Sequence, residues 1–256
     1  ILFFLFVSAE VFPATSIDKT RADLEIKLQV KIVYDSVCID SWKGVTYTYC
    51  NDTAVLHQYL QLLQTEYSKY PDGFFAKAGV NYLVLGRDLK YAGVIRAAVP
   101  DPYKHFLFLA VNGAYGDSSN VYRTHVMHHE LNHCSETLFW SSGYYEWKEW
   151  GAINRVGFKY RGNGAQAYGN SHINWYGITH PLQGFVNYYS TSSQEEDRSE
   201  LVALIMTDSE RHFLEEFSAT DVLIQKKLAL IVDYLNKQSG TSVNFWTEKI
   251  NWLPGK

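Results

Sequence analysis

The feature that most constrains this chain is the run His129-Glu130-Leu131-Asn132-His133, an H-E-x-x-H pattern in a stretch that reads as a helix. A helix advances about 100° per residue, so residues four apart lie on one face. His129 and His133 can therefore hold one metal ion through two imidazoles, with Glu130 beside them. The pattern predicts a zinc site of the kind used in hydrolysis, with Glu130 placed to act on zinc-activated water.

The preceding segment favours this interpretation over a chance match. His105 to Val111 is a short apolar run that predicts a buried strand, and a polar Asn-Gly and Gly-Asp-Ser-Ser-Asn loop separates it from the helix. Strand, loop and metal helix follow one another in the order that a zincin needs. We also expect the edge of this strand to offer a place for an extended peptide.

His125 falls on the same helical stripe, so two histidine pairs must be compared. His125 and His133 lie roughly 12 Å apart along the axis, whereas zinc–nitrogen bonds are about 2.0 to 2.1 Å, so these two cannot share an ion. The pair His125 and His129 remains open on distance, but only His129 and His133 bracket a glutamate. We expect His125 and His128 to support the site or to pack.

A catalytic zinc usually has three protein ligands and one open position, so a third ligand must come from elsewhere. Residues 188–200 read as the start of a helix that Ser192 or Ser193 caps, and acidic residues in its first turns suit the helix dipole. The helix dipole explains why acidic residues occur in this first turn, but it does not explain the spacing of Tyr189, Glu196 and Glu200. Other residues that can serve as the third ligand are Glu195, His172 and His180.

The spacing of Tyr189, Glu196 and Glu200 resembles the gluzincins of the lethal-factor and Pro-Pro endopeptidase clan. In that clan a tyrosine precedes the ligand glutamate and another glutamate follows four positions later. The resemblance implies that Glu196 is the third metal ligand and that Tyr189 donates a hydrogen bond to the oxyanion. It also implies that Glu200 orients a ligand histidine from behind.

The chain more closely resembles the bacterial family called putative zinc-binding metallopeptidases, many of them predicted surface or periplasmic lipoproteins. Three signatures carry the likeness: the H-E-x-x-H helix, the segment Trp150 to Tyr160, and the segment from Gly184-Phe185-Val186 through Tyr189 to Glu200. The family usually has proline where this chain has Arg155, and commonly alanine at Ser190 and Ser199. None of these departures touches an expected ligand.

Periodicity predicts strands over 28–34, 82–85 and 105–111, an amphipathic helix over 53–67, and helices over 195–236 with Thr220 or Asp221 near the start of the last one and Gly240 after it. The fold class we expect is α+β and zincin-like. Residues 21–140 would form an N-terminal α/β lobe with a mixed sheet and the metal helix. Residues 141–256 would form a loop-rich and helical lobe that completes the zinc site.

The N-terminus and the cysteines bear on the compartment. Residues 1–9 resemble the end of a secretory signal, so 1–20 is expected to be a signal remnant or an N-terminal extension; a buried first strand is the competing interpretation. Cys38 and Cys50 can pair across a hairpin in an oxidising compartment, while Cys134 is expected to be a buried thiol. A bacterial secreted, periplasmic or cell-surface location follows, without a stable membrane span.

The predicted function is zinc-dependent hydrolysis of peptide bonds in a peptide or protein substrate. A net charge of −4 without a long basic run argues against nucleic acid as a partner. The alternative is a non-catalytic, zinc-containing surface binding protein of a bacterial uptake system, against which the intact Glu130 argues. An aromatic cluster after the metal helix fits core packing better than a substrate or sugar groove; it comprises Trp140, Tyr144, Tyr145, Trp147 and Trp150.

Overall fold

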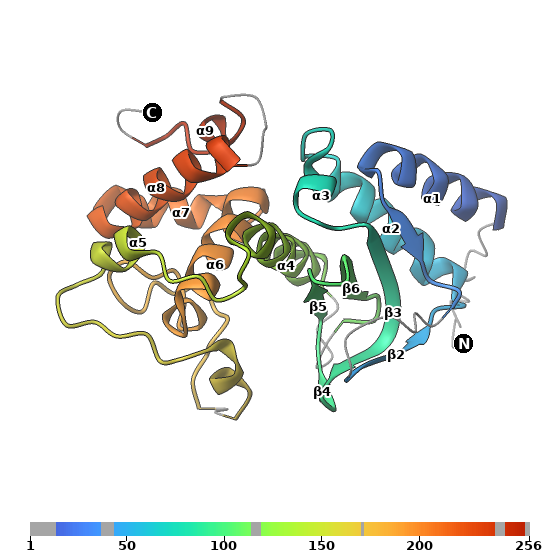
Figure 1. The fold of residues 1–256 in the computed structure, drawn as a ribbon, viewed down its shortest axis with the longest axis horizontal. Coiled ribbons are helices and arrows are strands. Elements are labelled where there is room, and N and C mark those ends of the chain that lie inside the picture. Colours follow the sequence, from blue (N-terminus) through green and yellow to red (C-terminus); the bar gives the residue numbers. More distant parts are fainter. Residues whose placement is uncertain (1–13, 37–43, 114–118, 170–171, 239–243, 254–256) are drawn as a thin grey trace, which may run out of the picture.

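The computed structural model describes residues 14–36, 44–113, 119–169, 172–238 and 244–253 (Figure 1). The expected signal remnant at residues 1–9, Cys38 and Gly240 lie outside these ranges. The pairing of Cys38 with Cys50 therefore stays a prediction. Cys50 itself is buried.

A mixed sheet lies in the N-terminal half of the chain. Its strands are β1 (Lys31–Val33), β2 (Val45–Tyr49), β3 (Tyr82–Tyr91), β4 (Val94–Ile95), β5 (Ala98–Asp101) and β6 (Phe106–Ala110). The main order is β1-β3-β6-β5, in which β1, β3 and β6 are parallel and β5 is antiparallel. Strands β2 and β4 pair with β3 in antiparallel fashion.

The expected strand over 105–111 is confirmed as β6, but the expectation that it offers a free edge is wrong. Strand β6 pairs with β3 on one side and with β5 on the other. The strand order β1-β3-β6-β5 ends with β5, so β5 is the edge strand next to β6, and it contains Pro100. Proline lacks a backbone N–H and is typical of edge strands.

Side chains alternate between the two faces of β3 and β6, as the strand period requires. Leu83 and Leu107 belong to the large core beneath the helices, whereas Val84 and Phe108 belong to a smaller cluster on the other face. Tyr47 of β2 covers that second face, with its ring centroid 5.6 Å from that of Phe108. Both faces of the central strands are therefore buried.

Three helices precede the site-bearing part of the chain: α1 (Ala14–Leu28), α2 (Thr53–Tyr67) and α3 (Phe74–Lys77). Helix α2 has the predicted bounds, and the Asp52 side chain caps it by accepting from the N–H groups of Ala54 and Val55. Helix α1 was not expected. It packs against α2 on the helical side of the sheet (Figure 1).

Helix α4 (Asn120–Trp140) runs between the sheet and the C-terminal helices (Figure 1). Beyond it lie α5 (Lys148–Ile153), the 3-10 turns η1 (Gly164–Gly169) and η2 (Tyr189–Thr191), α6 (Gln194–Met206), α7 (Arg211–Thr220), α8 (Val222–Gln238) and α9 (Phe245–Glu248). The prediction that 195–236 is helical is confirmed. Asp221 caps α8 by accepting from Leu223 N and Ile224 N.

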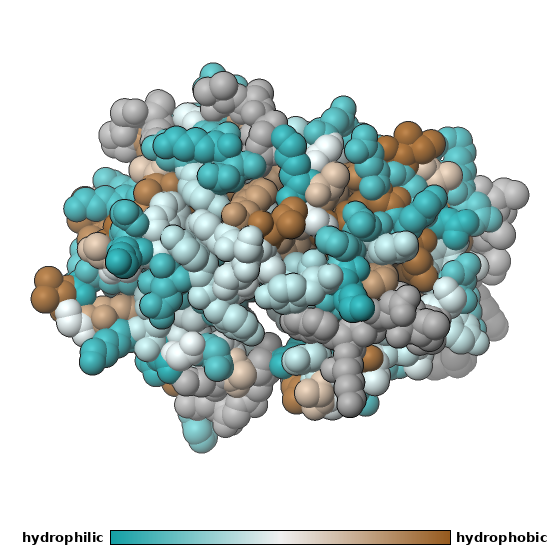
Figure 2. Space-filling model, in the orientation of Figure 1, coloured by the Kyte–Doolittle hydropathy of each residue, from teal (hydrophilic) through white to brown (hydrophobic). Residues whose placement is uncertain are grey.

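The predicted core packing of the aromatic cluster at the end of α4 is confirmed in part, because Trp150 is buried in the core and Trp147 packs half-buried against it. Trp140 stacks on Tyr145 and on Tyr234, and Trp147 packs beside Trp150. Tyr144 and Tyr145 are exceptions, because 76% and 39% of them are exposed. Much of the surface in Figure 2 is polar, and no described helix is long and apolar enough to cross a membrane.

A buried ion pair joins α4 to α6. Arg198 Nε lies 2.6 Å from Glu136 Oε1, and Arg198 Nη2 lies 2.9 Å from Glu136 Oε2, so the pair is bidentate. The guanidinium also lies over the Trp140 ring, 4.7 Å from its centroid. Because Arg198 and Glu136 are both buried, neither charge has water as a substitute partner.

Glu136→Gln should lower the free energy of unfolding by about 3 kcal/mol, since it leaves the Arg198 charge buried without its counter-charge. Urea denaturation of the metal-free protein measures this loss. Asp23→Asn, in the exposed pair of Lys19 and Asp23, is the control and should change the value by less than about 1 kcal/mol. Equal losses in the two variants would contradict a role for this pair in joining the helices.

Candidate functional site

Helix α4 presents the two histidines of the H-E-x-x-H pattern. Ser119 is its N-cap and accepts a hydrogen bond from Tyr122 N. Leu131 and Cys134 are fully buried in the core, which fixes the rotation of the helix. Cys134 is thus a buried thiol, as predicted, and burial raises its pKa well above the usual range.

The facing residues come from η2 and α6. Tyr189 begins η2, and Glu196 and Glu200 lie on successive turns of α6, which packs along α4. Ser193 is the N-cap residue of α6, but its side chain makes no capping hydrogen bond. The prediction that Ser192 or Ser193 caps the helix is confirmed in position for Ser193, whose backbone carbonyl accepts from Asp197 N, but the hydroxyl does not take part.

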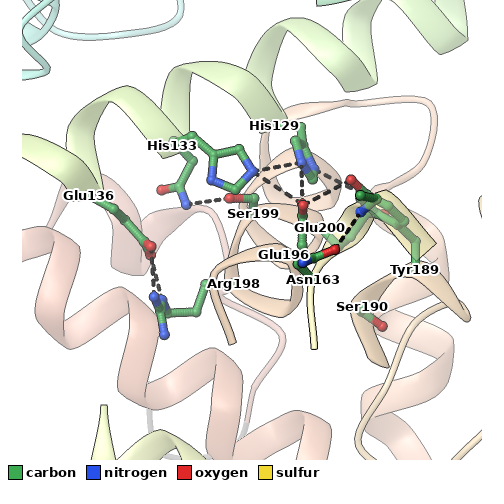
Figure 3. A network of polar contacts seen from close by, with 12 residues as sticks. His129, His133, Glu136, Asn163, Tyr189, Ser190, Glu196, Arg198, Ser199 and Glu200 are labelled. Carbon is green, nitrogen blue, oxygen red and sulfur yellow. Dashed lines mark hydrogen bonds and ion pairs between the residues drawn. The ribbon is translucent and has the colours of Figure 1, made fainter. Parts of the chain in front are cut away.

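Three polar atoms from these helices converge on one point (Figure 3). His129 Nε2 and His133 Nε2 are 3.0 Å apart. Glu196 Oε2 lies 3.0 Å from the first nitrogen and 3.2 Å from the second. The structure therefore brings together the three residues expected to bind metal.

The geometry of this triangle suits a metal ion better than hydrogen bonds alone. Ligands about 2.0 to 2.1 Å from a tetrahedral zinc lie roughly 3.3 Å from one another, close to the observed separations. With Glu196 ionised, as its lowered pKa indicates, no arrangement of protons satisfies all three contacts. Two Nε2–H groups would oppose each other, and a single one would leave a nitrogen lone pair facing the carboxylate. A cation in the centre satisfies all three atoms.

Glu200 lies behind His129, on the side away from this triangle. Its Oε1 lies 2.9 Å from His129 Nδ1, and its Oε2 accepts from Asn187 Nδ2 at 2.5 Å. A carboxylate at Nδ1 favours the tautomer whose Nε2 carries the lone pair, which is the form that binds a metal.

His125 continues this chain of contacts outward. Its Nε2 lies 3.2 Å from Glu200 Oε2, and its Nδ1 lies 2.7 Å from Glu210 Oε2. His125, His129 and Glu200 also form a second group that can hold a metal, but this group shares His129 with the first. His128 contacts neither group, since it bonds with Tyr70 and Glu66 on the core side.

Carboxylates and imidazoles alternate along this chain of contacts, and each shifts the pKa of its neighbours. Burial opposes ionisation of Glu196 and Glu200, yet the neighbouring histidines outweigh it and lower both pKa values well below the usual range. Burial also works against a charged His125, but Glu200 and Glu210 raise its pKa to about 9. For Glu130, burial dominates and raises the pKa, with His129, His133 and Arg96 opposing it.

Tyr189 and a glycine close one side of the triangle. The Tyr189 hydroxyl donates to Glu196 Oε1 at 2.9 Å. Gly164 passes so near that a Cβ built on it would lie 2.3 Å from both the hydroxyl and Glu196 Oε1. Only a residue without a side chain fits there, and this requirement was not foreseen from the sequence.

The other two sequence signatures meet at Asp197, next to Glu196. Asp197 Oδ2 accepts from Trp150 Nε1 at 2.9 Å and from the Tyr160 hydroxyl at 2.7 Å. It also lies 2.6 Å from Lys227 Nζ, which donates to the Gly184 carbonyl as well. The segments 150–160 and 184–189 thereby hold the first turn of α6 and fix the position of Glu196.

The remaining ligand candidates lie elsewhere. His180 pairs with Asp221 at 2.8 Å and stacks on Phe217. His172 is exposed, and neither it nor Glu195 belongs to a potential metal group in the described part of the chain. Glu195 faces a cavity beside the site.

A cleft extends from Glu130 in two directions. One arm, of about 490 Å³, runs past His125 to Glu210 and is called here the Glu210 arm. The other, of about 660 Å³, runs past His133 to Tyr144 and is called the Tyr144 arm. Four residues line both arms and define their junction, namely Arg96, Ala98, Glu130 and Tyr189.

Comparison with known proteins rests on the fold. No protein-family profile matches the chain, and no curated protein matches it by sequence. A crystal structure of a putative zinc-binding metallo-peptidase from Bacteroides caccae is similar, with a TM-score of 0.59 and 16% sequence identity over 96% of this chain and 94% of that one. The likeness shows a shared fold across almost the whole chain.

Gly164→Ala should weaken zinc binding by about 10- to 100-fold, the range found when groups that support metal ligands are altered. The added Cβ must displace Glu196 Oε1 or the Tyr189 hydroxyl. Competition with a chromophoric chelator measures the affinity. Ala165→Ser, which adds one atom to the exposed neighbour, is the control, and equal affinities in the two variants would show that the close approach is unimportant.

Proposed function

We propose that this protein is a zinc-dependent metalloendopeptidase of the gluzincin type. The observation that carries the proposal is the convergence of His129 Nε2, His133 Nε2 and Glu196 Oε2 beside Glu130, at the junction of a two-armed cleft. The fold shared with a putative zinc-binding metallo-peptidase supports it. The substrate we propose is a peptide or protein.

His129, His133 and Glu196 would hold the zinc, and the open side of the triangle would face Glu130. When bound, zinc supplies Lewis acidity that polarises a carbonyl and lowers the pKa of water toward about 7. Glu130 accepts the proton of the attacking water and passes it to the leaving amine. Burial raises the pKa of Glu130, which makes its carboxyl a stronger base and readier to carry this proton.

Tyr189 is placed to assist the reacting carbonyl. Its hydroxyl lies at the junction of the two arms and donates to Glu196 Oε1 here. If the hydroxyl instead donated to the oxyanion that develops on the carbonyl, it would stabilise the negative charge of the transition state. Loss of one such donor raises the activation free energy by about 2.7 to 4 kcal/mol in a studied hydrolase. Glu200 acts through His129, by holding the proton at Nδ1.

The two arms of the cleft support cleavage within a peptide chain rather than at its end. Both arms leave Glu130, so a substrate can continue on either side of the scissile bond. The edge strand β5 borders both arms through Ala98 and can pair with an extended peptide. Pro100 cannot donate in such a pairing, which limits it to the start of the strand.

Glu196→Ala should reduce zinc from one ion per chain to substoichiometric amounts after dialysis, since two histidines alone bind it weakly. Elemental analysis of the purified proteins measures this. Glu195→Ala, one residue earlier on α6, should retain the metal and serves as the control. Full zinc in the Glu196 variant would move the third ligand to another residue.

Glu130→Gln should retain one zinc per chain and lose hydrolysis by a factor of about 100 to 10,000, the usual contribution of a general base. A quenched-fluorescent peptide library and mass spectrometry of the products measure cleavage. Glu149→Gln, a first-turn carboxylate on the exposed side of α5, is the control. Undiminished cleavage by the Glu130 variant would rule out its role as base, and zinc without any cleavage by the wild type would favour a binding protein.

A further inference from the structure

The Tyr144 arm contains a buried carboxylate to which the proposed reaction gives no role. Glu195 lies in the first turn of α6 beside the ligand Glu196, and its side chain lines this arm. Only 7% of the residue is exposed. Among the ion pairs of the described residues, none includes Glu195.

We propose that Glu195 selects a positively charged substrate side chain, a lysine or arginine, in the Tyr144 arm. This inference rests on the proposed function, because it assigns the preference of the same cleft. The Glu195 carboxylate has lost hydration and keeps a hydrogen bond with Ser193 and the charge of His133 nearby, but no lysine or arginine supplies a direct counter-charge. An ammonium or guanidinium group from the substrate would supply that counter-charge.

The walls of the arm suit such a side chain. Tyr144 and Tyr103 both line the arm and are both exposed. Tyr144 lies close enough to Glu195 that, after burial, the carboxylate charge is the next largest cause of its raised pKa. Aromatic faces attract cations and pack against the methylene stem of lysine or arginine, so aromatic and acidic groups act together here.

The Tyr144 wall is held in place by α6 itself. Arg198 Nη2 donates to the Tyr145 carbonyl at 3.2 Å, and the Tyr144 N–H donates to Ser142 Oγ at 3.2 Å. Arg198 lies three residues after Glu195 on the same helix, and its guanidinium is occupied by Glu136. The backbone next to Tyr144 is therefore tied to the helix that carries Glu195, which keeps the acid and the aromatic residue in the same arm of the cleft.

Among the described residues that line the Glu210 arm, Glu130 serves as the proposed base, and no other carboxylate is comparable to Glu195. The carboxylates Glu200 and Glu210 of this arm are both occupied by His125. Arg96 is the one arginine or lysine among the described lining residues of either arm, and it lies at the junction. A substrate cation would be repelled near Arg96 and attracted further along the Tyr144 arm, so charge selection belongs to one side of the scissile bond.

Binding to the zinc-loaded Glu130→Gln protein tests this without depending on hydrolysis. The probes are fluorescent peptides of one sequence in which a single position, scanned along the peptide, is lysine, norleucine or glutamate. At one position the lysine peptide should bind about tenfold or more tightly than the norleucine peptide, as expected for a charge-assisted contact. Adding Glu195→Gln should bring that ratio near one, while adding Glu149→Gln should leave it unchanged.

Two further results separate the proposals. Zinc content of each variant shows whether Glu195→Gln has disturbed the metal site, and Glu195→Lys should transfer the preference to the glutamate peptide. A lysine preference that survives Glu195→Gln, or its absence at every scanned position, overturns the inference. A wild type that binds lysine peptides through Glu195 but cleaves none would overturn the proposed peptidase activity and leave the charge selection standing.

Discussion

The packing of α4 against α6 is the contact on which the rest of the site depends. The nitrogens of His129 and His133 come from one helix and the carboxylates of Glu196 and Glu200 from the other, so their separation is set by how the two helices meet. The bidentate pair of Glu136 and Arg198 fixes one end of this contact. Asn132, inside the H-E-x-x-H run, fixes the middle by donating to Ser199 Oγ at 3.0 Å.

A chain of buried and half-buried ionisable side chains runs outward from this interface. From the triangle of His129, His133 and Glu196 outward, carboxylates and imidazoles alternate in the order Glu196, His129, Glu200, His125 and Glu210. Each imidazole therefore lies between two carboxylates, and each carboxylate on the inside lies between two donors. Replacing one member would leave its neighbours buried without a partner, which costs more than the pair itself contributes.

The sequence predicted the elements whose patterns are strong and local. Helix α2 has an apolar stripe and an aspartate cap, and β6 is an uninterrupted apolar run, so both were found. Helix α1 was missed because it is only weakly amphipathic and follows a segment that resembles a signal remnant. The edge strand β5 was missed because it has four residues and includes a proline.

The site was predictable to the extent that spacing along a helix determines it. The contacts of Glu196 and Glu200 follow from residues four apart on one face, so a pattern of side chains was enough. Gly164, Lys227 and Glu210 reach the site from distant segments. None of the three belongs to a spacing pattern in the sequence that would indicate its contacts, so only the folded structure shows which residues it contacts.

The two serines that depart from the resembled family have a physical role in this chain. Where that family commonly has alanine, Ser199 accepts from Asn132 and ties α6 to the metal helix. Ser190 donates to the Asn187 carbonyl at 2.8 Å, and Asn187 in turn donates to Glu200. Both hydroxyls are fully buried and bonded, so they add directional contacts where alanine would add only packing. Ser190 therefore supports Glu200 through Asn187, and through Glu200 it supports His129, whereas Ser199 joins the two helices directly.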